Sequence, residues 1–500
     1  MTDGRRDSRP NAFNEPSRIA EAIGMSRYAF ILLIPLVVVL AAPAERPPPK
    51  SVGPVETFGV NVQRSMNLIV GSTALKRNTV RILFYGQSHI VSDWTRVLGE
   101  RLRRMYPLVD FVIENRAIGG FSAEWLVRTA DMDLYSFYPD LVIFHDYGDA
   151  DPLERIIRRL RERTTAEMVL LTDHVAPLVD GKWEEELEPG RMRPPKLGEH
   201  APAWRSHAFL PELAKKYRLE LVDVRPLWKQ YLADHKLKPG DLLYDDLLLN
   251  ADGNRLMVEL VLPHLRHRPD LAPHFDDPVR TYTVGDERDL QWKDGKLRLE
   301  FTGNKVDLIC KDAGEGAPAA IRIDGKKPSE FPELYGFART ALEEPYYRHH
   351  PPVVGLKSLA PLVLEEWTMK VTNYDREKKT FRFRVSGSHT GDDGAGESGK
   401  DFVSNSKRVS IEVFDMETYV PITIKHSNNP EATEATIRWR AVGRFADEFA
   451  VPEKRNPFGE TVVTAAQGLK NGKHVIEIDG GPDTPLAAIR VYKPTFPASE

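Results

Sequence analysis

The sequence predicts an α/β domain built on a parallel sheet, followed by a region made of β-strands. Between residues 76 and 272, short apolar runs alternate with segments whose apolar residues recur at helical spacing. From about Asp276 the helical spacing gives way to short alternating runs, separated by turn dipeptides such as Asp294-Gly295. At 500 residues the chain is also too long for one core, which favours several domains.

These patterns divide the chain into four parts. We expect an N-terminal extension with a signal peptide at 1–44, a linker and lead-in at 45–75, the α/β domain at 76–272 and the β region at 276–500. The linker prediction rests on the proline-rich stretch 45–55, which is typical of a semi-rigid spacer.

The N-terminal extension has the features of an export signal. Residues 29–42 form an uninterrupted apolar run that follows Arg27 and ends at Ala42-Pro43-Ala44, a small-residue cleavage site. The run of fourteen residues is short for a membrane span. We therefore expect an exported protein of the bacterial periplasm, cell envelope or extracellular space, with an uncleaved N-terminal membrane anchor as the alternative.

Composition excludes several kinds of partner. The net charge is −4 and there is no basic block, so nucleic acid is not an expected partner. Cys310 is the only cysteine, so the chain has neither an intrachain disulfide nor a cysteine-based metal site. No metal-spacing motif is present, and we expect neither a cofactor nor a metal ion. The sequence predicts no particular oligomeric state.

The α/β part is expected to contain strands joined by helices. The predicted strands lie at 81–85, 111–114, 141–145, 168–172 and 219–222, and the predicted helices at 95–106, 123–129, 152–163 and 250–267. Asn250 is expected to cap the last helix. Residues 173–207 follow a strand as a long loop, which we interpret as a substrate lid or a mobile insertion.

The β region is expected to form a jelly roll or sandwich with insertions. Its predicted strands lie at 297–301, 306–310, 320–323, 368–371, 381–385, 408–413, 436–439, 474–478 and 488–492. The Gly/Asp-rich stretch 387–396 is expected to be an exposed loop. The aromatic side chains of Trp292, Trp367, Trp439 and Tyr492 either pack in the core or stack on sugar rings.

One serine lies where an α/β sheet presents a nucleophile. The apolar run that ends at Tyr85 is followed by Gly86-Gln87-Ser88 and then by a predicted helix. A strand, a glycine turn and a serine place the hydroxyl at the carboxyl edge of the sheet, where such folds bind ligands. Ser88 is therefore a candidate nucleophile, with a plain turn residue as the alternative.

Four segments resemble the signature blocks of the SGNH/GDSL hydrolases. They are 84–88, where Gln87 replaces the family's Asp, 115–120, 148–151 and 245–250. The resemblance spans about 76–268 and implies a flavodoxin-like parallel sheet and ester hydrolysis. It also implies that Ser88 is the nucleophile, that Asp245 is the acid of the triad, and that the N–H groups of Ser88 and Gly120 form the oxyanion hole.

Two side chains of that signature are replaced. Ala150 occupies the place of the family's Asn, and Leu248 the place of its His. A serine needs a positioned base to attack, and leucine cannot serve as one. His145 and His174 end or follow strands at the same rim, and His174, next to Asp173, is the better candidate for a replacement base.

Two functions follow from this pattern. The first is an exported ester hydrolase that forms an acyl-serine on Ser88 and acts on a small-molecule or polysaccharide ester, with O-acylated carbohydrate as the implied class. The second is an inactive SGNH pseudoenzyme kept as a carbohydrate-binding or envelope scaffold protein. The β region would then carry the binding function.

Overall fold

The computed structural model of the chain describes residues 46–175, 202–245, 247–273, 278–285, 290–311, 316–342, 350–427 and 429–496. The expected signal peptide and most of the expected loop at 173–207 lie outside these residues. Across these ranges, no helix combines the length and the apolar character needed to cross a membrane.

A parallel sheet organises the first region. Within the described ranges its strand order is β2-β1-β3-β4-β5, the flavodoxin-like order. The bounds are β1 (Thr79–Gly86), β2 (Asp110–Asn115), β3 (Leu141–His145), β4 (Glu167–Leu171) and β5 (Glu220–Val222). All four pairings are parallel, which confirms the predicted fold class.

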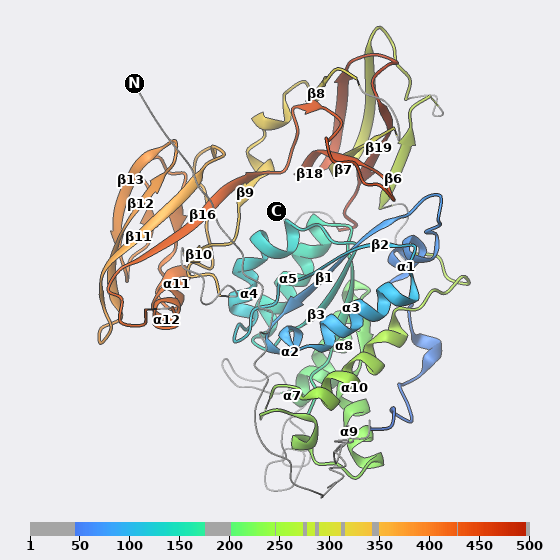
Figure 1. Cartoon of the computed structure of the whole chain (residues 1–500), viewed down its shortest axis with the longest axis vertical. Helices are drawn as coiled ribbons and strands as arrows, with labels where there is room; N and C mark the ends of the chain where they lie inside the picture. Colours follow the sequence, from blue (N-terminus) through green and yellow to red (C-terminus); the bar gives the residue numbers. More distant parts are fainter. Residues whose placement is uncertain are drawn as a thin grey trace, which may run out of the picture. The chain divides into compact units, whose positions relative to one another are not determined.

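Helices cover both faces of this sheet because its strands are apolar on both sides. In β1, Ile82 and Phe84 pack into one buried cluster, and Leu83 and Tyr85 into another. Figure 1 shows α3 and α10 on one face and α4 and α5 on the other. Helices α1 and α9 also pack on the first face, and α8 packs on the second. The helix bounds are α1 (Gln63–Val70), α3 (Trp94–Met105), α4 (Ala123–Ala130), α5 (Ala150–Arg163), α8 (Leu210–Tyr217), α9 (Val224–Asp234) and α10 (Ala251–Val261).

The last helix of this region begins as predicted and ends earlier. The Asn250 side chain accepts hydrogen bonds from the backbone N–H groups of Asp252 and Gly253, both at 3.0 Å, which makes it the N-cap. The α-helix ends at Val261 rather than near His267, and a short 3₁₀ turn, η5 (Leu262–His264), follows. Pro263 lies in that turn and has no N–H to continue the α-helical ladder.

The second region is antiparallel β-structure, as predicted. One described sheet has the order β17-β8-β18-β7-β19-β6, with β6 (Val279–Thr283), β7 (Lys296–Cys310), β8 (Ala319–Ile323), β17 (Glu448–Phe449), β18 (Val462–Asp479) and β19 (Leu486–Tyr492). The other has the order β10-β16-β11-β12-β13, and β9 also pairs with β16. Its strands are β9 (Tyr335–Phe337), β10 (Ala341–Leu342), β11 (Glu366–Asp375), β12 (Thr380–Gly387), β13 (Gly391–Glu397) and β16 (Ala435–Gly443). Each sheet has its own buried apolar cluster.

Several predictions for this region need correction. The stretch 387–396 is not a loop: Gly391 starts β13, which pairs with β12 as a hairpin. The runs at 297–301 and 306–310 belong to one strand, β7. The run at 408–413 contains the short strand β15 (Ser410–Ile411), which pairs with β14 (Phe402–Val403), and gives way to α11 (Val413–Met416).

Two of the aromatic side chains considered for sugar stacking are core residues. Trp367 and Trp439 have 0% and 3% of their surface exposed, and their rings stack on each other at 6.5 Å between centroids. Both belong to the apolar cluster of the sheet that contains β11 and β16. They pack inside the protein and present no face to a sugar.

The α/β region and the β region share buried side chains. Val354 and Tyr419, from the β region, pack into the cluster formed by α4 and α5. In return, Met132 of the α/β region packs into the cluster of the β11–β16 sheet. Tyr419 begins α12 (Tyr419–Lys425), which lies beside α11 in Figure 1. The second region thus reaches the helices that flank the carboxyl end of the parallel sheet.

Candidate active site

Ser88 lies directly after the central strand because glycine allows the chain to turn there. Gly86 ends β1 with φ +143°, and a Cβ at this position would lie 2.0 Å from the carbonyl oxygen of His145. A side chain is therefore excluded on both counts. The following residue, Gln87, accepts the N–H of Ile90 at 2.8 Å and starts the short helix α2 (Ser88–Val91). Ser88 is half-buried at the carboxyl edge of the sheet.

A backbone N–H meets the serine hydroxyl. Gly120 N–H donates to Ser88 Oγ at 3.1 Å. Gly120 has φ +78°, a conformation that favours glycine. A Cβ on the preceding Gly119 would lie 3.6 Å from Ser88 Oγ, beside the nucleophile. The structure thus brings together Ser88 and Gly120, the two residues that the sequence associates with the oxyanion hole.

The loop that carries Gly120, residues 115–120, is fixed to the strand and helix next to Ser88. Asn115 donates from its amide to the carbonyl oxygen of Ile90 at 2.8 Å and to Thr95 Oγ1 at 3.0 Å. The N–H of Ile118 donates to the carbonyl oxygen of Gly86 at 2.9 Å. These bonds connect the loop to both sides of the Gly86–Ser88 turn.

His145 lies at the end of β3, beside Gly86 in the sheet register. Its Nε2–H donates to Asp173 Oδ1 at 2.9 Å, and its Nδ1 accepts from the Gln87 amide at 3.2 Å. The ring is fully buried. The sequence favoured His174 as the base because Asp173 and the loop at 173–207 could orient it; in the structure Asp173 bonds His145. Both ring nitrogens of His145 are engaged, and Gln87, which bonds Nδ1, is the residue directly before Ser88.

His174 bonds a backbone carbonyl. Its Nε2–H donates to the carbonyl oxygen of Leu247 at 3.0 Å, and its ring stacks on that of His89 at 4.7 Å between centroids. Burial, together with the nearby His145, lowers the pKa of His174 to about 4. The ring is therefore uncharged at neutral pH. In the described part of the chain no hydrogen bond joins His174 to Ser88.

Asp245 and Leu248 are both exposed. Asp245 Oδ1 accepts the N–H groups of Leu247 at 2.7 Å and of Leu248 at 2.6 Å, and these bonds lower the pKa of the carboxyl group. The Leu248 side chain is 37% exposed. Among the described contacts, none joins Asp245 to a histidine or to Ser88, so the predicted nucleophile, acid and base are not assembled as a hydrogen-bonded triad. Ala150, the first residue of α5, offers only a methyl group.

His89 and Asp146, which follow Ser88 and His145 in the chain, are buried, and burial favours the neutral form of each. Burial, with the neighbouring His145 and His174, lowers the pKa of His89 well below its usual value. Burial also raises the pKa of the Asp146 carboxyl well above its usual range. In the described part of the chain, no three His, Cys, Asp or Glu side chains are grouped as ligands for a metal ion.

Comparison with known proteins yields distant structural matches. No protein-family model and no curated protein matches the chain. Among solved structures, it is similar to a two-domain esterase active on acetylated mannans, with 13% identity, a TM-score of 0.33, and coverage of 89% of this chain and 99% of that chain. An acetyl xylan esterase has 18% identity and a TM-score of 0.30, covering 37% of this chain and 98% of its own. A catalytic mutant of an acetylxylan esterase from Geobacillus stearothermophilus has 14% identity and a TM-score of 0.32, covering 39% and 98%.

The structure of the chain itself therefore defines its class of fold. The strand order, the turn at Gly86 and the Gly120 N–H at Ser88 Oγ are the features that the SGNH resemblance implies. The chain has an SGNH-like α/β fold joined to an antiparallel β region.

Proposed function

We propose that this protein is a serine ester hydrolase of the SGNH type with Ser88 as its nucleophile. The observation that carries the proposal is the hydrogen bond from Gly120 N–H to Ser88 Oγ at 3.1 Å. A donor that meets the hydroxyl oxygen lies close to where the oxygen of an attacked carbonyl develops its charge. The half-exposed position of Ser88 leaves it accessible to an ester.

The proposed reaction proceeds through an acyl-serine. Ser88 Oγ bonds to the ester carbonyl carbon, and the negative charge on the carbonyl oxygen is stabilised by the N–H groups of Ser88 and Gly120. The alcohol then leaves with a proton, and water releases the acyl group as a carboxylic acid. The serine proton needs an acceptor, and His174 is the candidate: its Nδ1 forms no hydrogen bond with the described residues. With a pKa of about 4, His174 is a weak base, so we expect slow turnover.

We further propose an O-acylated carbohydrate as substrate and an exported location. The substrate class is the one that the SGNH resemblance implies, and the acetylated mannans of the two-domain esterase belong to it. Gly120 is exposed and Ser88 half-exposed, so an ester on a bulky chain could reach the hydroxyl. The location rests on the apolar run at 29–42 and the small residues that follow it.

The second candidate function is an SGNH scaffold without catalysis. It is favoured by the exposed Leu248, which occupies the place of the family's histidine, and by Asp245, whose carboxylate accepts the N–H groups of Leu247 and Leu248.

Replacement of the nucleophile separates the two functions. Ser88→Ala should lower acetate release from an acetylated polysaccharide, and hydrolysis of an aryl acetate, by about 10²-fold or more, because no other group can form the acyl intermediate. Ser51→Ala, a serine change in the linker, should leave both rates unchanged. Equal rates for wild type and Ser88→Ala would instead favour the scaffold.

A further inference from the structure

Two side chains of the β region bind the loop that carries Gly120. Arg339 Nη2 donates to the carbonyl oxygen of Arg116 at 3.0 Å. His350 Nε2–H donates to the carbonyl oxygen of Gly119 at 2.6 Å. Both acceptors lie in the loop 115–120, one near its start and one next to the donor that meets Ser88. The β region therefore contacts the backbone of the proposed oxyanion hole.

The contact at Gly119 acts on the peptide group that faces Ser88. The Gly119 carbonyl and the Gly120 N–H belong to one planar peptide, in which the two groups point in opposite directions. His350 holds the oxygen end, and Ser88 Oγ meets the N–H end. If this peptide rotated, the carbonyl oxygen would turn toward Ser88 and the donor would be lost.

Rotation is a real alternative at this position because the peptide lies between two glycines. Gly120 has φ +78°, and glycine adopts positive and negative φ with similar ease. The N–H of Phe121 donates to the carbonyl oxygen of Ile118 at 3.2 Å across this peptide, but such a turn bond is compatible with either orientation of the peptide. The hydrogen bond from His350 therefore supplies a restraint that the local sequence does not.

The imidazole of His350 is itself held in place. Its ring packs against Phe121 at 5.6 Å between centroids and a 66° interplanar angle, and against Tyr419 at 6.2 Å and 23°. Phe121 directly follows Gly120, and Tyr419 begins α12. The histidine is thus fixed by one ring from each region of the protein.

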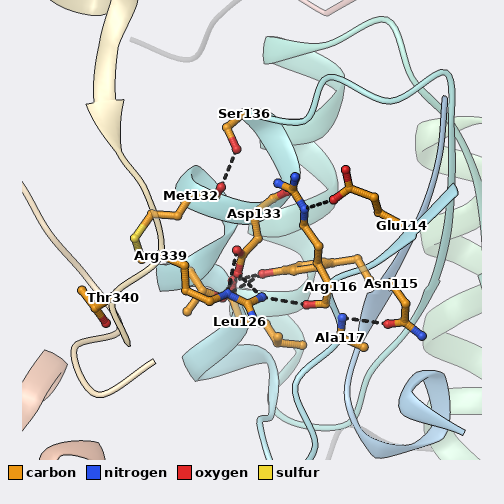
Figure 2. Close-up of polar contacts among 12 residues, drawn as sticks. Glu114, Asn115, Arg116, Ala117, Leu126, Met132, Asp133, Ser136, Arg339 and Thr340 are labelled. Atoms are coloured by element: carbon orange, nitrogen blue, oxygen red, sulfur yellow. Dashed lines mark hydrogen bonds and ion pairs between the residues drawn. The ribbon is translucent and has the colours of Figure 1, made fainter. Parts of the chain in front are cut away.

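Arg339 braces the start of the same loop. Its guanidinium binds both oxygens of Asp133, at 2.9 and 2.8 Å, while reaching the Arg116 carbonyl. Figure 2 shows this group, in which Arg116 donates to the Asp133 backbone oxygen at 2.8 Å. Asp133 is 2% exposed. A planar guanidinium with a buried carboxylate on one side and a carbonyl on the other is a rigid support.

We propose that His350 is a positioning residue for the reaction at Ser88, holding the Gly119–Gly120 peptide so that the Gly120 N–H faces the developing oxyanion. Arg339 supports the start of the same loop. The inference rests on the proposed function, since it assigns a role in that reaction. It makes the β region a part of the active site rather than an appended module.

The test compares three variants of the full chain. His350→Ala removes the donor, and His350→Gln keeps an N–H near the position of Nε2. His474→Ala is the matched control, because His474 Nε2 also bonds a backbone carbonyl, that of Lys470 at 2.8 Å, within the β region. On an aryl acetate, His350→Ala should lower kcat by about 10- to 10²-fold with KM changed less than about threefold, since complete loss of one oxyanion donor costs ~10²–10³. His350→Gln should recover kcat to within a few-fold, and His474→Ala should match wild type.

Hydrogen exchange gives a readout that does not depend on activity. Exchange of the Gly120 amide with deuterium, measured by mass spectrometry of peptides covering 115–121, should be faster in His350→Ala, and restored in His350→Gln. The proposal is wrong if the Gly120 amide exchanges at the same rate in His350→Ala and in wild type. It is also wrong if His350→Gln turns over as slowly as His350→Ala, because the imidazole would then act directly. If wild type shows no Ser88-dependent turnover, the proposed function fails while the exchange experiment still decides the role of His350.

Discussion

Single residues set up half of the proposed hydrolase site in this protein. Gly86 permits the turn that presents Ser88, and Gly120 directs an N–H to the Ser88 hydroxyl. The residues that would activate the hydroxyl are arranged differently. Leu248 lies exposed in the place of the family's histidine, and Ala150 contributes no donor. The site therefore combines a positioned nucleophile with weak activation.

Restoring the missing histidine should increase the rate. Leu248→His places an imidazole in the turn held by Asp245, whose carboxylate could fix its tautomer. A positioned general base contributes ~10²–10⁴, so we expect aryl acetate turnover to rise by about 10²-fold. Adding Ala150→Asn, which supplies an amide donor, should raise it further, and the two effects should not be additive because base and oxyanion hole act together.

The control for that gain is the same pair of changes in a Ser88→Ala background. No increase is expected there. If Leu248→His leaves turnover unchanged while the Ser88-dependent rate of wild type is lost in His174→Ala, the base lies at His174, and position 248 has no catalytic role.

Site residues that belong to a short local motif could be predicted from the sequence. Those whose contacts come from distant parts of the chain could not. Ser88 and Gly120 could be found because each lies within a short block of its own strand and loop. The pairing of Asp173 with His145 reversed the expectation, since adjacency to His174 in the chain said nothing about side-chain direction. His350 gave no local signal: its partner, Gly119, is 231 residues away. Only the packing of the two regions brings them together.

At the level of elements, a short helix, a strand and the segment after another strand bring three histidine rings together. His89 comes from α2, His145 from the end of β3 and His174 from the segment after β4. The His89 ring lies 4.7 Å from each of the other two, between centroids. Neither ring nitrogen of His89 bonds a described residue. Burial in this packing lowers the pKa of His89 and of His174, so it favours their uncharged rings.

The free energy of unfolding should therefore fall in acid. The folded-state pKa of His174 is depressed from 6.5 to about 4, so the unfolded chain binds protons first. Stability is fully present above pH 6.5 and is lost as the pH falls toward 4, by about 3 kcal/mol for His174 alone. His89, with its pKa also lowered, adds to the loss.

Urea unfolding at pH 7.5 and pH 5 of wild type and of His89→Phe checks this expectation. The phenylalanine ring cannot titrate, so the variant should lose less stability between the two pH values. Asp146, whose raised pKa acts in the opposite direction, is present in both proteins and cancels in the comparison. An equal loss in both would show that His89 does not contribute.

The elements themselves were largely predictable where apolar periodicity is strong. The five strands of the parallel sheet were each placed to within two residues at either end, because buried strands give continuous apolar runs. The hairpin at β12–β13 was missed because β13 is rich in Gly and Asp, which disfavour strands. There, pairing with β12 and the buried Asp393, which accepts from Ser406, override local preference.

For the whole molecule, the two regions are joined through side chains that both cores share. Tyr419 packs among the helices of the α/β region and also against His350. Arg128 of α4 binds Asp415 of α11 at 2.7 Å. The same interface that buries apolar surface thus carries the contacts to the loop 115–120. The packing of the β region on the helices of the α/β region therefore also brings His350 to the Gly119 carbonyl.

The most direct test of the central claim is to trap Ser88 chemically. A fluorophosphonate reacts when the serine oxygen bonds to phosphorus and fluoride and the serine proton leave, so it reports an activated serine. Mass spectrometry of the digested full-length protein should find the phosphonyl group on Ser88, with slower labelling in His350→Ala and none at this site in Ser88→Ala. Absence of label on Ser88, under conditions that fully label a known serine hydrolase, would contradict the account.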